Sequence, residues 1–366
     1  TDRVDAVFVE QCRGRVEDES GLGCPLHGRE CGLGSHMTKT TPIGKVVCMR
    51  TSQIGIPARW VTVVMSAVFV VCWSSGFIGA KLGAGEAPVL TVLMWRFLVV
   101  AVVLGAAVYF RWRRRGLAPM SGRAVGSQVV IGALSQAGYT VTVYWAIALG
   151  VSTGTTALID GVQPLVVAAL AGPLLGAVTH RRRWWGLLVG AAGVVLVTWS
   201  DATSSADAPW WAYLVPLLGM AALVAATFLE RRVVDPPSPM IILAIHCGVS
   251  AVIFTAAGLL AGVAVPPADR TFWLAIAWLS ILSTLGGYGL YWILLRRSGV
   301  TSVNTLMFLM PPVTAVWGTA MYGEPFGWAT ALGLAMAGGA TWVVNRAESS
   351  TKVRDRRRAA EAVGAL

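Results

Sequence analysis

Four ionisable residues lie inside otherwise apolar stretches of the sequence, and they are the first candidates for chemistry. They are Arg96, Asp160, His246 and Glu324. A charged side chain within a membrane span is costly unless it is paired or hydrated, so such residues typically mark a solute or ion pathway. The pattern predicts a polar site buried within a membrane protein.

Asp160 is the best placed of these residues, because it belongs to a polar stripe. Thr153, Thr156, Asp160 and Gln163 recur at spacings of three, four and three, which places them on one helix face. Pro164 lacks an amide hydrogen, so we expect it to free the backbone carbonyl of Asp160. A carboxylate beside an unpaired carbonyl suits an ammonium group or a proton, and protons are therefore a candidate coupling ion.

Arg96 is the candidate charge partner within the membrane. Arg96 and Asp160 lie about seven residues from the same end of their spans, so the helix rise puts both about 10 Å deep. An ion pair between them is geometrically allowed. Such a pair could brace the structure or take part in transport, and the sequence leaves both roles open.

Aromatic and amide residues on neighbouring spans are expected to complete the site. Such side chains suit an amphipathic organic solute, although packing explains any single aromatic residue equally well. Pro311 and Pro312 break a later span as Pro164 breaks the earlier one, which indicates gating positions. The predicted substrate-binding residues are Asp160, Gln163, Thr156, Gln136, Tyr139, Tyr288, Trp292 and Asn304.

Three other patterns are weaker. Gly150-Val151-Ser152-Thr153-Gly154 matches the G-x-S-x-G motif, so Ser152 with His246 permits an intramembrane serine hydrolase, but that motif requires a strand before its helix. His246 is more often a packing residue than a proton relay. Cys24, His27 and Cys31 lack a fourth ligand at a zinc-finger spacing. The sequence predicts no metal and no cofactor.

The elements that must position these residues are membrane-spanning helices. Of the 366 residues, 55% are hydrophobic and only 13% are charged, and the charges crowd into the ends. About 20 apolar residues cross a hydrocarbon core, and the sequence supplies ten such runs. They lie near 60–80, 89–110, 125–148, 153–176, 184–200, 210–229, 239–260, 272–295, 301–322 and 326–345.

The arginine distribution predicts the orientation of these spans. Loops 2–3, 4–5, 6–7 and 8–9 hold five, three, two and two arginines, whereas the other loops hold only Lys81 and Arg270 as basic residues. Basic loops are retained in the cytoplasm. The pattern predicts a multi-pass protein of the bacterial plasma membrane with both termini in the cytoplasm. Its loops leave no room for a separate catalytic domain.

The segments outside the spans differ in composition. Residues 1–58 are charged and glycine-rich, and we interpret them as a disordered or non-native leader, with Met37 and Met49 as candidate natural starts. The basic tail 346–366 is expected to lie near anionic lipid rather than on nucleic acid. Gly186, Gly190 and Gly193 favour close helix packing, in a monomer or a homodimer.

The two halves of the apolar region resemble each other. Gln163-Pro164 aligns with Met310-Pro311, and each proline is followed twelve residues later by a glycine. Because one half has five spans, its copy must enter the membrane from the opposite side. We therefore predict an all-α membrane protein of ten helices, built as two inverted five-helix repeats over 59–200 and 201–345.

Five short motifs stand out in the apolar region. They are Trp73-Ser74-Ser75-Gly76-Phe77, Trp95-Arg96-Phe97, Tyr291-Trp292, Met310-Pro311-Pro312 and Gly323-Glu324-Pro325. Together they resemble the EamA family of the drug/metabolite transporter superfamily. Gly176-Ala177 departs from the family's glycine-glutamate pair, which Gly323-Glu324 keeps. The resemblance implies ten helices and export of amino acids, other metabolites or drug-like compounds.

The sequence as a whole predicts a secondary transporter and not an enzyme. It contains no nucleotide-binding motif, so the energy would come from a solute or ion gradient. Small organic solutes and the lipid bilayer are the expected partners. The alternative within the class is a nucleotide-sugar or phosphate-ester exchanger, which would need more basic residues in its cavity than Arg96 alone.

Overall fold

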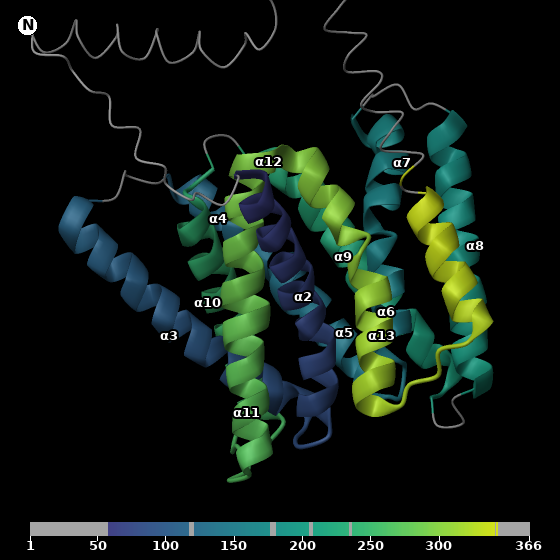
Figure 1. The fold of residues 1–366 in the computed structure, drawn as a ribbon. Helices are drawn as coiled ribbons and strands as arrows, with labels where there is room; N and C mark the ends of the chain where they lie inside the picture. Colours follow the sequence, from purple (N-terminus) through teal and green to yellow (C-terminus); the bar gives the residue numbers. More distant parts are fainter. Residues whose placement is uncertain are drawn as a thin grey trace, which may run out of the picture. The chain divides into compact units, whose positions relative to one another are not determined.

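The computed structural model describes residues 58–116, 121–175, 181–204, 208–233, 236–340 and 342, and every regular element among them is helical (Figure 1). The predicted leader up to residue 57 and the basic tail lie outside these residues. The elements are α2 (Ala58–Ala84), α3 (Val89–Arg115), α4 (Gly122–Gly132), η1 (Ala133–Gly138), α5 (Tyr139–Ala148), α6 (Thr153–Gly161), α7 (Gln163–Leu175), α8 (Arg181–Ser204), η2 (Trp210–Leu214), α9 (Val215–Glu230), α10 (Pro239–Leu260), α11 (Arg270–Trp278), η3 (Leu279–Tyr288), α12 (Gly289–Met307), α13 (Met310–Tyr322) and a helix at Trp328–Ala340.

Seven helical stretches of the described chain are long and apolar enough to cross a membrane. They coincide with the first, second, fourth, fifth, sixth, seventh and eighth predicted spans. The third predicted span is a helical run that includes the π-helical segment η1, and the tenth coincides with the shorter apolar helix Trp328–Ala340. The all-helical class is therefore confirmed, whereas the count of ten, the repeat boundaries and the inverted relation stay predictions.

The structure corrects the boundary between the eighth and ninth spans. The sequence placed a loop at residues 296–300, but α12 continues through it to Met307. A glycine such as Gly299 weakens a helix by about 1 kcal/mol without ending it. The break comes just before α13, whose first turn contains Pro311 and Pro312. Prolines are tolerated there because the first amides of a helix have no helical acceptor.

Helices that are distant in sequence pack closely. The rings of Phe97 in α3 and Phe254 in α10 stack at 5.6 Å, and Trp278 in α11 donates to the carbonyl of Ser75 in α2 at 3.0 Å. Because Gly154 in α6 has no side chain, α13 can pack directly against it. A Cβ added there would lie 2.8 Å from the Cβ of Ala315.

The glycine motif in α8 packs within the chain. A Cβ added at Gly193 would lie 2.7 Å from the carbonyl oxygen of Gly333, and one at Gly190 would lie 2.7 Å from Leu165. Figure 1 shows α8 beside the helix Trp328–Ala340, drawn in yellow. Contacts inside one chain therefore account for these two glycines.

Candidate transport site

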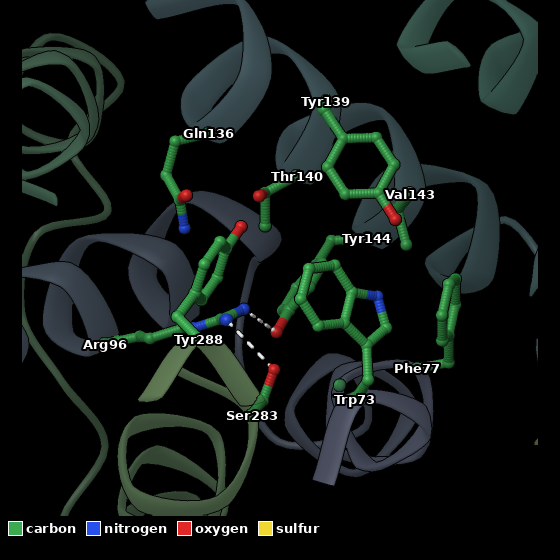
Figure 2. A pocket seen from close by; sticks show the side chains of 11 residues that line it. Trp73, Phe77, Arg96, Gln136, Tyr139, Thr140, Val143, Tyr144, Ser283 and Tyr288 are labelled. Atoms are coloured by element: carbon green, nitrogen blue, oxygen red, sulfur yellow. Dashed lines mark hydrogen bonds between the residues drawn. The ribbon is translucent and has the colours of Figure 1, made fainter. Parts of the chain in front are cut away.

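A small cavity of about 40 Å³ lies among α2, α3, α5 and the two π-helical segments. One wall is formed by η1 together with α5, and another by η3. Both walls contain residues that the sequence predicted to bind solute. Figure 2 shows its side chains. They are those of Trp73, Phe77, Arg96, Gln136, Tyr139, Thr140, Val143, Tyr144, Ser283 and Tyr288.

Arg96 supplies the positive charge of this cavity. Its side chain is buried, and its guanidinium donates to the hydroxyls of Tyr144, Ser283 (3.3 Å) and Thr284 (3.1 Å). The Tyr144 ring also lies beneath the guanidinium, 5.5 Å from ring centroid to Cζ. Hydroxyl groups are uncharged, so these partners orient the guanidinium without neutralising its positive charge. The guanidinium lines the cavity (Figure 2).

The structure does not pair Arg96 with Asp160, and this corrects the ion pair that the sequence allowed. Among the described residues the salt bridge present joins Lys81 to Glu324. Equal depth along two helices does not fix how the helices are rotated or which element separates them. Each charged group has a tyrosine as its partner instead: Tyr139 donates to Asp160, and Arg96 donates to Tyr144.

Asp160 lies behind the cavity wall rather than on it. The hydroxyl of Tyr139, which lines the cavity, donates to Asp160 Oδ2 at 2.6 Å. The other carboxylate oxygen, Oδ1, is buried and has no hydrogen-bond partner. A buried polar atom without a partner is costly. Oδ1 of Asp160 can therefore accept a hydrogen bond from an ammonium group, or bind a proton.

The chain changes helix beside Asp160, close to Pro164. α6 ends at Gly161 and α7 begins at Gln163, with Pro164 in its first turn. The amide of Val162 donates to the carbonyl of Ile159 at 3.4 Å, and Pro164 has no amide hydrogen to donate to the carbonyl of Asp160. The free carbonyl of Asp160 stays a prediction. The gating roles of Pro164, Pro311 and Pro312 stay predictions.

The polar stripe of the fourth predicted span does not line the cavity as a unit. Thr156 donates to the backbone carbonyl of Ser152, and Gln163 donates to Thr227 in α9 at 3.2 Å. Thr156 and Gln163 are not among the side chains that line the cavity, and their substrate-binding roles stay predictions. Gln136, Tyr139 and Tyr288 do line the cavity. The side chains of Trp292 and Asn304 are outside the described part of the structure.

The π-helical segments bring in residues that the sequence analysis missed. The residues of η3 from Leu279 to Tyr288 are π-helical, with backbone hydrogen bonds to the carbonyl five residues earlier. The side-chain hydroxyl of Thr284 also donates to the carbonyl of Leu279, at 3.0 Å. Ser283 and Tyr288, five residues apart, consequently share the cavity face. The sequence analysis found Tyr288 but missed Ser283. Tyr144 had a detectable signal, because it follows Gln136 and Thr140 at steps of four.

Another buried carboxylate, that of Glu324, lies near the end of α2 and the start of α6. The carboxylate of Glu324 bonds Lys81 Nζ at 2.6 Å, the Thr153 hydroxyl at 2.6 Å and the Thr153 amide at 3.0 Å. We call Lys81, Thr153 and Glu324 the Glu324 cluster. The left-handed backbone of Gly323, with φ of 65°, ends α13 immediately before it. The cluster joins three helices that are far apart in sequence.

The predicted hydrolase pair is not assembled. Ser152 caps the N-terminus of α6, and its hydroxyl exchanges hydrogen bonds with Thr155. His246 instead contacts Gln128 at 2.9 Å, and Gln128 donates to Glu230. Serine and histidine therefore have separate partners. The packing interpretation of His246 fits its contact with Gly132, where an added Cβ would lie 2.8 Å from the imidazole.

Comparison with known proteins places these features in a family. The sequence profile of the EamA-like transporter family matches residues 60–199 and 210–346. The chain is 25% identical over 261 residues to the inner membrane transporter YedA of Escherichia coli (strain K12), covering 70% of this chain and 81% of YedA. It is also 25% identical over 281 residues to a transporter of Archaeoglobus fulgidus, covering 74% and 93%.

Two further proteins are similar to this chain. A WAT1-related chloroplastic protein of Arabidopsis thaliana is 25% identical over 217 residues, covering 54% of this chain and 50% of that protein. A crystal structure with 18% sequence identity matches with a TM-score of 0.55 over 78% of this chain and 96% of that chain. The latter likeness concerns the fold alone.

Proposed function

The chain belongs to the EamA-like transporter family, and from this premise we propose that it is a secondary transporter that exports small organic solutes by alternating access. The proposed solutes are amino acids, related metabolites or amphiphilic drug-like compounds. The proposed location is the bacterial plasma membrane, with both termini in the cytoplasm. The arginine-rich loops and the inner membrane relative YedA support this location.

The observation that carries the proposal is the position of the Arg96 guanidinium beside a buried cavity, where its hydrogen-bond partners among the described residues are all hydroxyl groups. A solute carboxylate would accept hydrogen bonds from the Arg96 guanidinium and neutralise its charge. Tyr139 and the unpartnered Oδ1 of Asp160 provide an acceptor for a solute ammonium or a proton. Trp73 and Tyr288, whose rings lie 5.1 Å apart, provide apolar surface for the rest of the solute.

The size of the cavity supports a cycle of conformations. Its volume of about 40 Å³ accommodates about three waters, whereas organic ligands occupy pockets of about 300–1,000 Å³. Solute binding therefore requires the helices around Arg96 to separate. In an alternating-access cycle, the two halves rock so that this site opens to one side at a time.

The cavity lining favours carboxylates over phosphate esters. Among the side chains that line it, Arg96 is the single cation. A doubly charged phosphate group in a buried site requires several basic partners. The lining thus ranks the nucleotide-sugar or phosphate-ester exchanger below the amino-acid or amphiphile exporter.

The proposal is tested by comparing extracellular metabolites between cells that overproduce the protein and cells that lack it. We expect a carboxylate-bearing metabolite to accumulate outside overproducing cells and to fall in the deletion strain. The candidate is then loaded into liposomes with the purified protein to measure flux directly. An unchanged extracellular profile in both strains, with the protein present in the membrane, would exclude export.

A further inference from the structure

A second and larger hollow lies between α3, α10 and the start of α12. Its volume is about 380 Å³, and its apolar surface includes Leu104, Met240, Leu243 and Leu285. The three helices present consistent faces, since Met240 and Leu243 are three residues apart and Leu285, Gly289 and Ile293 follow at steps of four. We call this hollow the α3–α10 vestibule.

The vestibule exists because α3 and α10 pack closely at one end and diverge at the other. At the closed end, Thr91 donates to the carbonyl of Val263 at 2.6 Å, and Phe97 stacks on Phe254. Toward its C-terminal end, α3 diverges from the other helices (Figure 1). The hollow occupies this wedge, with Arg111 and Ser238 at its wide end.

Tyr288 lines both the vestibule and the central cavity, and no other described side chain does so. It is the last residue of the π-helical segment η3. A rotation of this ring would connect the two spaces. The path between them begins at one arginine, Arg111, and ends at another, Arg96.

Both arginines lack an acidic partner in the described structure, where the salt bridge present uses Lys81 and Glu324. Arg111 is exposed at the wide end of the vestibule, and Arg96 is buried beyond Tyr288. The carboxylate of an organic anion would pair with Arg111 first and with Arg96 afterwards. The leucine side chains between the two arginines would contact the apolar part of the same molecule.

We propose that the α3–α10 vestibule binds an organic carboxylate with an apolar body, head group at Arg111, and delivers it past Tyr288 to the central cavity. This inference rests on the proposed transport function and narrows its substrate class. The shape and lining of the vestibule match an amphiphile that approaches from the arginine-rich side of the membrane.

The binding test uses Met240→Cys as a reporter in purified protein embedded in phosphatidylcholine nanodiscs. The rate of labelling by N-ethylmaleimide is measured with decanoate and with decyltrimethylammonium, which carries the opposite charge on a chain of the same length. The same protein without Met240→Cys gives the background rate. We expect decanoate to slow labelling at least fivefold and the cation to leave it within twofold.

Matched arginine variants identify the head-group contact. Arg111→Gln is expected to remove most of the protection by decanoate and Arg111→Lys to retain part of it. Arg113→Gln, on the same helix but outside the vestibule lining, should retain all of it. Equal protection by both amphiphiles, or unchanged protection in Arg111→Gln, would overturn the proposal. So would full protection by phosphatidylglycerol nanodiscs without decanoate, because the occupant would then be anionic lipid.

Delivery to the cavity has a separate readout. Tyr288→Trp should lower solute flux at least tenfold, because the larger ring obstructs the passage. In this variant, the decanoate protection of Met240→Cys should still depend on Arg111. Intact protection in a protein that transports nothing would overturn the proposed function but not the vestibule site. Wild-type flux without any protection would overturn the vestibule site alone.

Discussion

At the scale of single residues, the site keeps its two buried charges apart. Arg96 is oriented by hydroxyls and Asp160 by Tyr139. A direct ion pair would neutralise both groups and leave little for a solute to gain by binding. Separate neutral partners keep both charges available, at a cost in stability that a transporter can recover when the solute binds.

Asp160→Asn is expected to abolish transport or to uncouple it from protons. The amide keeps the size of the side chain and can still accept from Tyr139, but it can neither carry a negative charge nor release a proton. Flux into proteoliposomes is measured across a pH range. We expect a loss of at least tenfold with unchanged membrane insertion, and wild-type flux with an unchanged pH profile would contradict the role.

Asp269→Asn provides the matched control for this prediction. Asp269 is exposed and caps α11 by accepting from the Thr271 amide at 2.5 Å. Asparagine also serves as an N-cap, so the same chemical change should leave flux within twofold. A similar loss in both variants would indicate a general effect of removing a carboxylate.

Arg96→Lys is expected to lower transport by about tenfold to a hundredfold. Lysine keeps the charge but lacks the planar fork that reaches Tyr144, Ser283 and Thr284 together. Hydrogen bonds to charged groups contribute about 1.5–3 kcal/mol each, so losing one accounts for this range. The measurement is the concentration dependence of solute flux. Wild-type affinity in the variant would show that Arg96 only braces the helices.

At the scale of elements, the sequence predicts the spans but not the π-helical segments within them. Apolar length is a strong signal, and the predicted spans 89–110 and 239–260 coincide with α3 and α10. A π-helical segment differs from an α-helix by a small shift in hydrogen bonding, which no local residue pattern specifies here. The face that carries Ser283 was missed for this reason.

Gly154→Ala tests the close packing of α6 against α13. The added Cβ would lie 2.8 Å from the Cβ and 3.0 Å from the Cα of Ala315, so one helix must move. Overpacking of this kind costs about 1–3 kcal/mol. We expect a lower apparent melting temperature for the protein in detergent, followed by tryptophan fluorescence.

Gly248→Ala, within α10, is the matched control for that packing test. Apart from the adjacent residues and the backbone of α10 itself, no atom of the described residues lies within 4 Å of a Cβ built at Gly248. Alanine restricts the unfolded chain and stabilises a helix by about 0.4–1 kcal/mol. Its melting temperature should be equal or higher. Similar destabilisation by both changes would contradict the contact between Gly154 and Ala315.

At the scale of the whole molecule, local periodicity leaves out the contacts between distant helices. Gln136, Tyr139 and Tyr288 were predicted as amide and aromatic residues of neighbouring spans, and they meet in the cavity. The contacts of Glu324 with Lys81 and Thr153 span 243 and 171 residues of sequence. Which charges meet depends on how the helices are rotated and joined, and one sequence does not encode that in any short pattern.

The Glu324 cluster leads to a prediction about access to the central cavity. With the proposed orientation, the cluster lies on the outer side, where it ties α2 and α6 to the end of α13. Breaking a buried ion pair costs about 3–5 kcal/mol. The side chain of Lys81 is 33% exposed, so we expect a smaller cost for breaking this ion pair, about 1.4 kcal/mol. This cost corresponds to a tenfold change in the equilibrium between the closed and outward-open states.

Glu324→Gln should therefore increase access to the cavity from outside the cell. Thr140→Cys, which lines the cavity, serves as the reporter. Its labelling by a membrane-impermeant thiol reagent on intact cells should accelerate about tenfold, relative to the same protein without the reporter. Lys81→Gln should act similarly, and the double variant should add little because one contact is lost in both cases. Glu86→Gln, an exposed carboxylate near the same end of α2, should have no effect. Equal labelling in the Glu324 and Glu86 variants would mean that the cluster stabilises the fold without closing the outer side.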